Sequence, residues 1–251
     1  MPLVDVELHH LVAPPWSGVG HVDRHRERVA GRDDVEALYA PPRAGEVIRN
    51  GLASPVRSSP KQPVILAAGR LWDEAKNVAA LAAVAPGLPW PVRIAGPLAA
   101  GNSRRDDRPL LRPSHVTWLG ELSRGELLAE MQHATIFAAP AVYEPFGLTV
   151  LEAALAGCAL VLADIASFRE LWDGAALFVD PRDQAMLEAA LARVARDEPL
   201  RRTLQRRAAF RAQRYSHDAM SDAYCALYQQ MAGARPVARA APGRTAIESR
   251  P

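Results

Sequence analysis

Two glutamates, Glu144 and Glu152, are the residues whose spacing points most directly to chemistry. Seven residues, Pro-Phe-Gly-Leu-Thr-Val-Leu, separate them. The proline locks φ and the glycine tolerates a positive φ, so the segment predicts a tight turn followed by a helix. Good helix formers continue over residues 148–156, and Gly157 stands where a left-handed C-cap is expected. The two carboxylates therefore bracket the start of a predicted helix.

A strand is predicted just before this turn, because Ala134–Ala139 is a short apolar run. The resulting strand, turn and helix leave the backbone N–H groups of Phe146, Gly147 and Leu148 at a helix N-terminus, which binds phosphate well. Carboxylates accept hydrogen bonds from vicinal sugar hydroxyls. Two of them beside a phosphate cradle suit a nucleotide sugar, which carries a sugar at each end of a diphosphate. Ordinary complementation of the helix dipole is the alternative explanation for the two glutamates.

Arg70 and Lys76 belong to a second loop of the same kind. They follow the apolar run Val64–Ala68, so they lie beyond the carboxyl end of a predicted strand, where open α/β sheets bind ligands. Arginine offers a planar fork to phosphate oxygens and lysine a compact charge. The chain has only two lysines, Lys61 and Lys76, which favours a specific use for Lys76. A solvated charged loop is the alternative.

Strands and helices alternate along the chain. Short apolar strands separated by helices predict a parallel sheet covered on both faces, and right-handed crossovers make it a doubly wound, Rossmann-like α/β sheet. Ser123 with Glu126, and Ser167 with Glu170, have the spacing of capping boxes. The predicted strands are Val64–Ala68, Val92–Ala95, His115–Leu119, Thr135–Ala139, Ala159–Ala163 and Ala176–Val179. The predicted helices are Asn77–Val84, Arg124–Gln132, Leu148–Ala156, Phe168–Trp172, Gln184–Arg196, Leu200–Arg214 and His217–Met231, the last capped by Ser216.

In their order along the chain, several motifs resemble the C-terminal, donor-binding half of GT-B glycosyltransferases of family 4, which retain anomeric configuration. The resemblance covers roughly residues 46 to 230. It is carried by Val47-Ile-Arg-Asn-Gly51, Gly69-Arg70 with Lys76, Val92-Arg-Ile-Ala-Gly96, Val116-Thr-Trp-Leu-Gly120, Glu144 to Glu152, the segment 153–157 and Phe168-Arg-Glu-Leu171.

The resemblance implies a role for each matching position. Arg70 and Lys76 would bind the diphosphate, Glu144 the transferred hexose and Glu152 the nucleotide ribose; Glu144, Arg70 and Lys76 are the implied catalytic residues. The other implied donor-binding residues are Gly69, Leu122, Phe146, Gly147, Leu148 and Thr149, with Leu122 and Glu121 bordering the base. The cosubstrate is a nucleoside diphosphate sugar, and no metal or other cofactor is expected because the two basic residues replace it.

Composition excludes several other classes. The chain has 251 residues, a net charge of +2 and 49% hydrophobic residues, which predicts a soluble globular protein and no nucleic-acid partner. No apolar run approaches ~18 residues, so no membrane span is predicted. The two cysteines, Cys158 and Cys225, suit neither a disulfide framework nor a metal site, and both are predicted to pack as small apolar residues. With no signal peptide evident, a cytoplasmic location is expected.

The predicted organisation is half of a GT-B enzyme. Residues 46–231 form the donor-binding domain, residues 1–45 are an irregular remnant of the acceptor domain or linker, and residues 232–251 are a disordered tail. The acceptor domain itself has no counterpart. Two alternatives to a complete enzyme therefore stay open: a non-catalytic nucleotide-sugar-binding remnant, and one subunit of a split glycosyltransferase. The apolar stripe of helix His217–Met231 is expected to dock an acceptor-domain subunit or a second copy of the chain.

Overall fold

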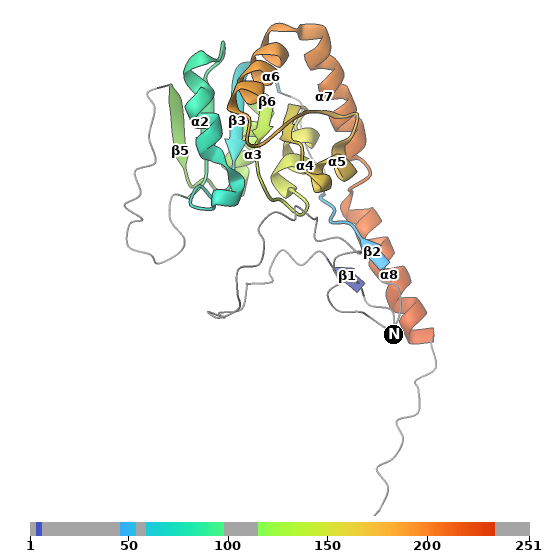
Figure 1. The fold of residues 1–251 in the computed structure, drawn as a ribbon. Helices are drawn as coiled ribbons and strands as arrows, with labels where there is room; N and C mark the ends of the chain where they lie inside the picture. The colour runs from blue at the N-terminus through green and yellow to red at the C-terminus, as the bar shows by residue number, and fades with distance from the viewer. Residues whose placement is uncertain (1–3, 7–45, 54–58, 98–114, 234–251) are drawn as a thin grey trace, which may run out of the picture.

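The computed structural model describes residues 4–6, 46–53, 59–97 and 115–233. Its centre is a six-stranded, wholly parallel sheet with the order β5-β4-β3-β6-β7-β8 (Figure 1). The strands are β3 (Gln62–Ala68), β4 (Val92–Ala95), β5 (Val116–Gly120), β6 (Ala134–Ala139), β7 (Ala159–Ala163) and β8 (Ala176–Val179). The chain adds strands in one direction from β3 to β5, then returns to β6 and builds in the other. The predicted doubly wound α/β fold is confirmed.

Helices cover both faces of the sheet. One core cluster joins one face to α3, α4, α5 and α7, and the other joins the opposite face to α2, α6 and Leu204 of α7. Alternate residues of β3 enter the two clusters, Val64 and Leu66 on one side and Ile65 and Ala67 on the other. The helices are α2 (Val78–Val84), α3 (Arg124–His133), α4 (Leu148–Leu155), α5 (Ala166–Trp172), α6 (Gln184–Arg196), α7 (Glu198–Ala212) and α8 (His217–Gly233), with short 3-10 turns η1 (Glu74–Lys76) and η2 (Ala85–Gly87).

Every predicted strand and helix is present, with ends displaced by at most two residues. The capping box of Ser123 and Glu126 is confirmed by both of its hydrogen bonds, and Ser216 accepts a hydrogen bond from the amide of Ala219. The second predicted capping box is wrong. α5 begins at Ala166, so Ser167 is already inside the helix, and its hydroxyl donates to the backbone oxygen of Glu144 instead.

The two cysteines differ in environment. Cys158 is fully buried at the start of β7, as predicted, and burial raises the pKa of its thiol to about 11. Cys225 on α8 is exposed, so the prediction that both cysteines pack in the interior is wrong for this one. The sequence around Cys225 shows a helix, but not which side of that helix faces the rest of the protein.

Lys61, the lysine just before β3, has a structural role. Its ammonium donates to the backbone oxygens of Met131 and Ala134 at 2.9 Å and of Ala156 at 2.6 Å. These carbonyls lie at the C-terminal ends of α3 and α4, where the helix dipoles concentrate negative charge. Burial lowers the pKa of Lys61, and the nearby Cys158 opposes that shift. One ammonium thus ties two helix ends to the beginning of the central strand.

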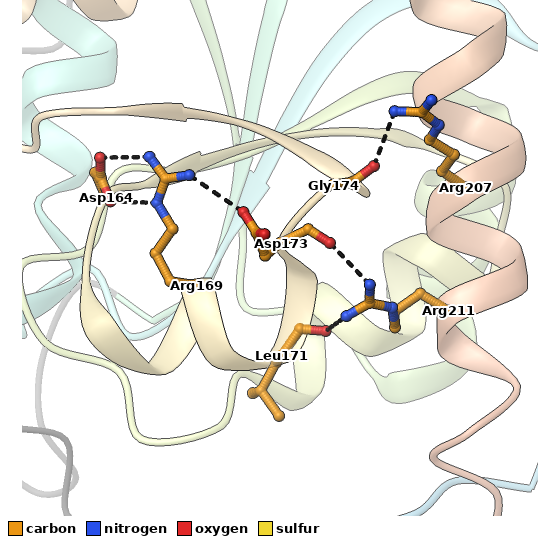
Figure 2. Close-up of polar contacts among 7 residues, drawn as sticks. All are labelled: Asp164, Arg169, Leu171, Asp173, Gly174, Arg207 and Arg211. Atoms are coloured by element: carbon orange, nitrogen blue, oxygen red, sulfur yellow. Dashed lines mark hydrogen bonds and ion pairs between the residues drawn. The ribbon is translucent and has the colours of Figure 1, made fainter.

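The end of α5 is held by arginines of α7 (Figure 2). Arg211 donates to the backbone oxygens of Leu171 and Asp173, at 3.1 and 2.8 Å, and Arg207 donates to that of Gly174 at 3.3 Å. The last carbonyls of a helix lack intrahelical partners, and cationic side chains satisfy them well. α7 therefore fixes the orientation of α5 against the sheet.

A second, two-stranded parallel sheet joins β1 (Val4–Val6) to β2 (Glu46–Ile48). α8 runs away from the main sheet alongside β2 (Figure 1). On α8, Leu227 is fully buried whereas Tyr228 is 60% exposed. The predicted apolar stripe of this helix is thus only partly covered.

No helix in the described part of the chain is long and apolar enough to cross a membrane. The predicted disordered tail starts two residues too early, because α8 continues to Gly233. The rest of that tail, from 234 onward, lies outside the described residues, as do residues 7–45.

Glycine is required where the loops after β3, β4 and β5 meet. The amide of Gly96 donates to the oxygen of Gly120 at 2.7 Å, and the amide of Gly69 donates to the oxygen of Ala95 at 3.1 Å. Gly96 has a φ of +141°, and a Cβ at this position would lie 1.7 Å from the oxygen of Gly69. Any larger residue at 96 must therefore push the β3 loop away.

We expect Gly96→Ala to lower the free energy of unfolding by at least ~3 kcal/mol, because it combines an unfavourable φ with backbone overlap. Gly120→Ala is the matched control. Its φ of +71° is also positive, but its Cβ would meet no atom within 4 Å, so we expect a loss of only ~1–2 kcal/mol. Urea unfolding monitored by circular dichroism measures both values. Equal losses for the two variants would show that the close approach at Gly96 carries no cost.

Candidate functional site

The candidate site lies where the strand order reverses. β3 and β6 are neighbours in the sheet and run in parallel, so their carboxyl ends open on the same edge. The loop after β3 carries Gly69, Arg70 and Lys76, and the loop after β6 carries Glu144. Such a reversal leaves a crevice that the crossover helices do not cover, and it is the usual ligand site of open α/β sheets.

Lys76 and Glu144 meet across this edge. The Lys76 ammonium lies 2.5 Å from Glu144 Oε2, and the two side chains are only 19% and 11% exposed. The other carboxylate oxygen, Oε1, accepts a hydrogen bond from the amide of Gly147 at 3.1 Å. The structure therefore brings together two of the predicted catalytic residues and one of the predicted backbone donors.

The two loops are fixed to each other by further hydrogen bonds. The Val142 amide donates to the oxygen of Ala75 at 2.9 Å. Asn77 has a left-handed φ of 50°, and its side-chain amide donates to the oxygens of Pro140 and Pro181, at 3.0 and 2.8 Å. Asparagine tolerates this conformation better than most residues. Asn77 thus connects the loops after β3, β6 and β8.

The start of α4 has the predicted turn. Gly147 has a φ of +80°, and a Cβ there would lie 3.0–3.3 Å from Phe168, Val150 and Glu144. The sequence predicts a free amide at Gly147, but in the structure this amide donates to the Glu144 carboxylate. The amides of Leu148 and Thr149, in the first turn of the helix, donate to no acceptor among the described residues. They are the groups of α4 that suit an anion.

Phe146 anchors this turn through its side chain. The ring is buried and packs edge-on against Tyr215, with 5.6 Å between the ring centroids. Gly69 lies on the facing loop, where a Cβ would lie 3.4 Å from the Lys76 side chain. Phe146 therefore shapes the site by holding the turn, whereas a Cβ at Gly69 would make only an ordinary van der Waals contact with Lys76.

Arg70 lies apart from the Lys76–Glu144 pair in this structure. Its guanidinium binds Asp73 of its own loop at 2.7 Å and covers the ring of Trp72, with 5.3 Å to the ring centroid. The arginine side chain is 56% exposed. It is consequently able to turn toward a ligand at the edge of the sheet without disturbing the core.

Glu152 faces the third loop of the site. Its side chain is 12% exposed, and its Oε1 lies 3.3 Å from the Nε of Arg124, the first residue of α3. Burial raises the pKa of Glu152, and the charge of Arg124 opposes that shift. Arg124 follows the half-buried Leu122 and the exposed Glu121, so this contact connects α4 to the loop after β5.

Three residues of the site were not predicted from the sequence. Asn77 and Arg124 belong to no recognisable motif, because their contacts are with loops that are distant in the sequence and come together only in the folded chain. Ser167 was assigned to a cap, yet its hydroxyl lies 2.5 Å from the Glu144 backbone oxygen, and the residue is buried.

α5 is also tied to the end of β7, because Arg169 binds both oxygens of Asp164 at 2.6 Å (Figure 2). Within the described ranges, no group of three or more His, Cys, Asp or Glu side chains could hold a metal ion.

Comparison with known proteins identifies the family. The sequence pattern of the family described as glycosyl transferases group 1 matches residues 53–211, which include every residue of the site. The chain belongs to this family. Its sheet and site edge are therefore those of a glycosyltransferase group 1 domain, the Rossmann-like half of a GT-B fold.

Two mycobacterial relatives share part of this sequence. The phosphatidyl-myo-inositol mannosyltransferase of Mycolicibacterium smegmatis is 33% identical over 123 residues, covering 48% of this chain and 32% of the relative. The glycogen synthase of Mycobacterium tuberculosis is 41% identical over 103 residues, covering 40% of this chain and 24% of the relative. The match thus spans a third or less of the length of these curated relatives.

Solved glycosyltransferases share the fold at low sequence identity. Sucrose-phosphate synthase from Thermosynechococcus elongatus has a TM-score of 0.68 and 21% identity, over 79% of this chain and 56% of that one. HepE from Anabaena, in complex with UDP and glucose, has a TM-score of 0.65 and 18% identity, over 74% of this chain and 57% of that one. In both cases the likeness covers little more than half of the other protein.

The contact of Ser167 with Glu144 can be tested against the capping box that it replaces. We expect Ser167→Ala to lower the free energy of unfolding by about 1–3 kcal/mol, because it leaves a partly buried carbonyl without its donor. Glu170→Ala is the control, since Glu170 forms a surface ion pair with Arg49 and its loss should cost less than ~1 kcal/mol. Thermal and urea unfolding give both values. Similar losses for the two variants would instead favour the capping box.

Proposed function

We propose that this chain is the donor-binding half of a retaining glycosyltransferase of family 4, which binds a nucleoside diphosphate sugar. The observation that carries the proposal is the Lys76–Glu144 pair at the strand-order reversal, directly before the N-terminus of α4. A cation, a carboxylate and free helix amides at one edge provide separate partners for phosphate and for sugar hydroxyls.

Each residue has a task in the proposed reaction. Lys76, Arg70 and the amides of Leu148 and Thr149 stabilise the diphosphate as the bond to the sugar breaks and negative charge develops on it. Glu144 accepts hydrogen bonds from hydroxyls of the transferred hexose, and Glu152 accepts them from the ribose. Leu122 borders the base. The two basic residues supply the positive charge that the leaving group needs, so the proposal includes no metal or other cofactor.

The donor is proposed to be a UDP-sugar in the first instance. Two structural neighbours support this donor: HepE was solved with UDP-glucose, and the pneumococcal O-GlcNAc transferase GtfA with UDP and GlcNAc. Titration with a panel of UDP-, GDP- and ADP-sugars identifies the base and the sugar of the donor. Calorimetry on the whole 251-residue chain is the direct test, and failure of all three nucleotides to bind would overturn the proposed function.

Transfer requires a second half that positions the acceptor. The described residues contain one Rossmann-like sheet, whereas the structural neighbours are nearly twice as long as the region they share with it. We propose that an acceptor-binding half completes the enzyme. α8 is the proposed docking element, because Tyr228 is exposed and Tyr224 stacks on it with 6.2 Å between the ring centroids. A second copy of the chain at this helix, and a binding module without catalysis, are the competing outcomes.

The two ends of the ligand can be separated by substitution. Lys76→Ala and Arg70→Ala should each weaken binding of the nucleoside diphosphate by about 1.5–3 kcal/mol and leave binding of the bare nucleoside almost unchanged. Glu152→Gln should weaken binding of both, because the ribose is common to them. Calorimetry with UDP and uridine distinguishes the cases. Loss of uridine binding in Lys76→Ala would contradict the assignment of this lysine to the diphosphate.

The isolated chain should bind a donor yet transfer little sugar. Orientation of two substrates supplies an effective molarity of order 10⁵ M or more, and a lone donor domain does not provide it. We therefore expect donor binding by calorimetry together with turnover at least ~10⁴-fold below that of a two-domain glycosyltransferase. Radiolabelled sugar transfer to an added acceptor measures the second quantity. Rapid transfer by the purified monomer would show that no separate acceptor half is needed.

A further inference from the structure

The carboxylate of Glu144 is already bound to two groups that suit a phosphate. Its Oε2 lies 2.5 Å from the Lys76 ammonium, and its Oε1 accepts a hydrogen bond from the Gly147 amide at 3.1 Å. A lysine ammonium and a backbone amide at a helix N-terminus are typical phosphate donors. Glu144 therefore occupies, within the protein, part of the position where an anion would be held.

The low exposure of Lys76 and Glu144 strengthens the competition of the carboxylate with a phosphate. Both side chains of the pair are largely shielded from water, which strengthens the attraction between their charges. A diphosphate that approaches Lys76 must share the ammonium with Glu144 or displace the carboxylate, and it is also repelled by the carboxylate charge. A bare nucleoside diphosphate offers Glu144 no new partner in return.

A hexose on the diphosphate changes this balance. Its hydroxyls are hydrogen-bond donors, so they can satisfy the carboxylate oxygens that leave Lys76 and Gly147. The ammonium and the amide then become available to the phosphate oxygens. The same substitution of partners runs in reverse once the sugar has been transferred, because Glu144 loses its hydroxyl donors and returns to Lys76.

We propose that Glu144 is an internal competitor of the diphosphate for Lys76, which lowers the affinity for the spent nucleotide relative to the sugar-bearing donor. The inference rests on the proposed function and adds to it a determinant of donor-over-product selectivity. Tight binding of the product would slow turnover, and a carboxylate that reclaims the lysine promotes product release. Glu144 thus acts on the sugar in the donor complex and on the lysine in the product complex.

Glu144→Gln is the decisive variant, because it keeps the size and shape of the side chain while removing its charge. Its amide oxygen can still accept from Gly147, but its NH2 group cannot accept from Lys76. We expect this variant to bind UDP about 5–10-fold more tightly than the unmodified chain, and UDP-glucose no more tightly. The ratio of the dissociation constants for UDP and UDP-glucose should therefore fall at least fivefold. If the unmodified chain prefers GDP or ADP, that nucleotide and its glucose conjugate replace the UDP pair. Isothermal titration calorimetry on the whole chain measures all four constants.

A matched control and a double variant test whether competition for Lys76 causes the change in UDP affinity. Glu130→Gln removes a carboxylate that is likewise paired with a cation, Arg93, at 2.8 Å, but that lies on α3 and not beside the Lys76 loop. It should leave the ratio unchanged. In the Lys76→Ala background, Glu144→Gln should give less than half of its gain in UDP affinity on a logarithmic scale, because the shared partner is gone. A full gain there would overturn competition for Lys76.

The remaining outcomes are also informative. Weaker binding of UDP and UDP-glucose by the same factor in Glu144→Gln would show that the ion pair only supports the loops, and would overturn the inference while leaving the proposed function intact. If Glu144→Gln does not fold, as judged by circular dichroism, Glu144→Asp takes its place. This change shortens the side chain by one methylene and weakens its contact with Lys76, so the same sign of effect is expected. Failure of the unmodified chain to bind any nucleotide would overturn both proposals.

Discussion

The parallel pairing of β3 with β6 is the constraint on which the site depends. Ile65 and Leu66 of β3 lie opposite Ile136 and Phe137 of β6, and all four side chains are fully buried. Because the two strands are parallel, the segments that follow them leave the sheet at the same edge, although Lys76 and Glu144 are 68 positions apart in the sequence. Burial of the strand residues in both core clusters fixes the register, since a slip of one residue would exchange the two faces.

The charges at this edge are balanced within the protein. Arg70 has Asp73, Lys76 has Glu144 and Arg124 has Glu152. Such pairing limits the cost of placing charged side chains where water is partly excluded. It also means that a charged ligand exchanges partners with existing ion pairs rather than meeting isolated charges. The exposure of each cation sets how readily it changes partner: Arg70 and Arg124 are mostly exposed, whereas Lys76 is not.

The sequence was sufficient to predict the sheet and the main features of the edge. The apolar runs gave all six strands of the main sheet, because both faces of a parallel sheet must be buried. Gly147 was assigned correctly to a positive φ, since the residues around it permit a turn followed by a helix. The assignments that failed depend on distances between segments. Ser167 has cap spacing in the sequence, but Glu144 lies close enough to take its hydroxyl. β1 was not predicted because three residues carry too little pattern to identify a strand.

The scarcity of lysine pointed to two specific roles, but the sequence did not show which lysine belongs to the site. It drew attention to Lys76, which the structure places at the site edge, yet Lys61 is equally rare and serves the ends of α3 and α4. The difference lies in their partners. Lys61 binds backbone oxygens that every sequence possesses, so no motif marks it, whereas the carboxylate that binds Lys76 belongs to a recognisable segment.

This pair of lysines makes the chain convenient for amine chemistry. The protein has no other lysine, so reagents such as acid anhydrides or succinimidyl esters meet only two side-chain amines. Modification of Lys61 requires that its contacts with three backbone oxygens open, and therefore follows separation of the helix ends from β3. Modification of Lys76 requires only that it leave Glu144. Two peptides in a mass spectrum thus record, from a single labelling reaction, the opening of the core and the opening of the sheet edge.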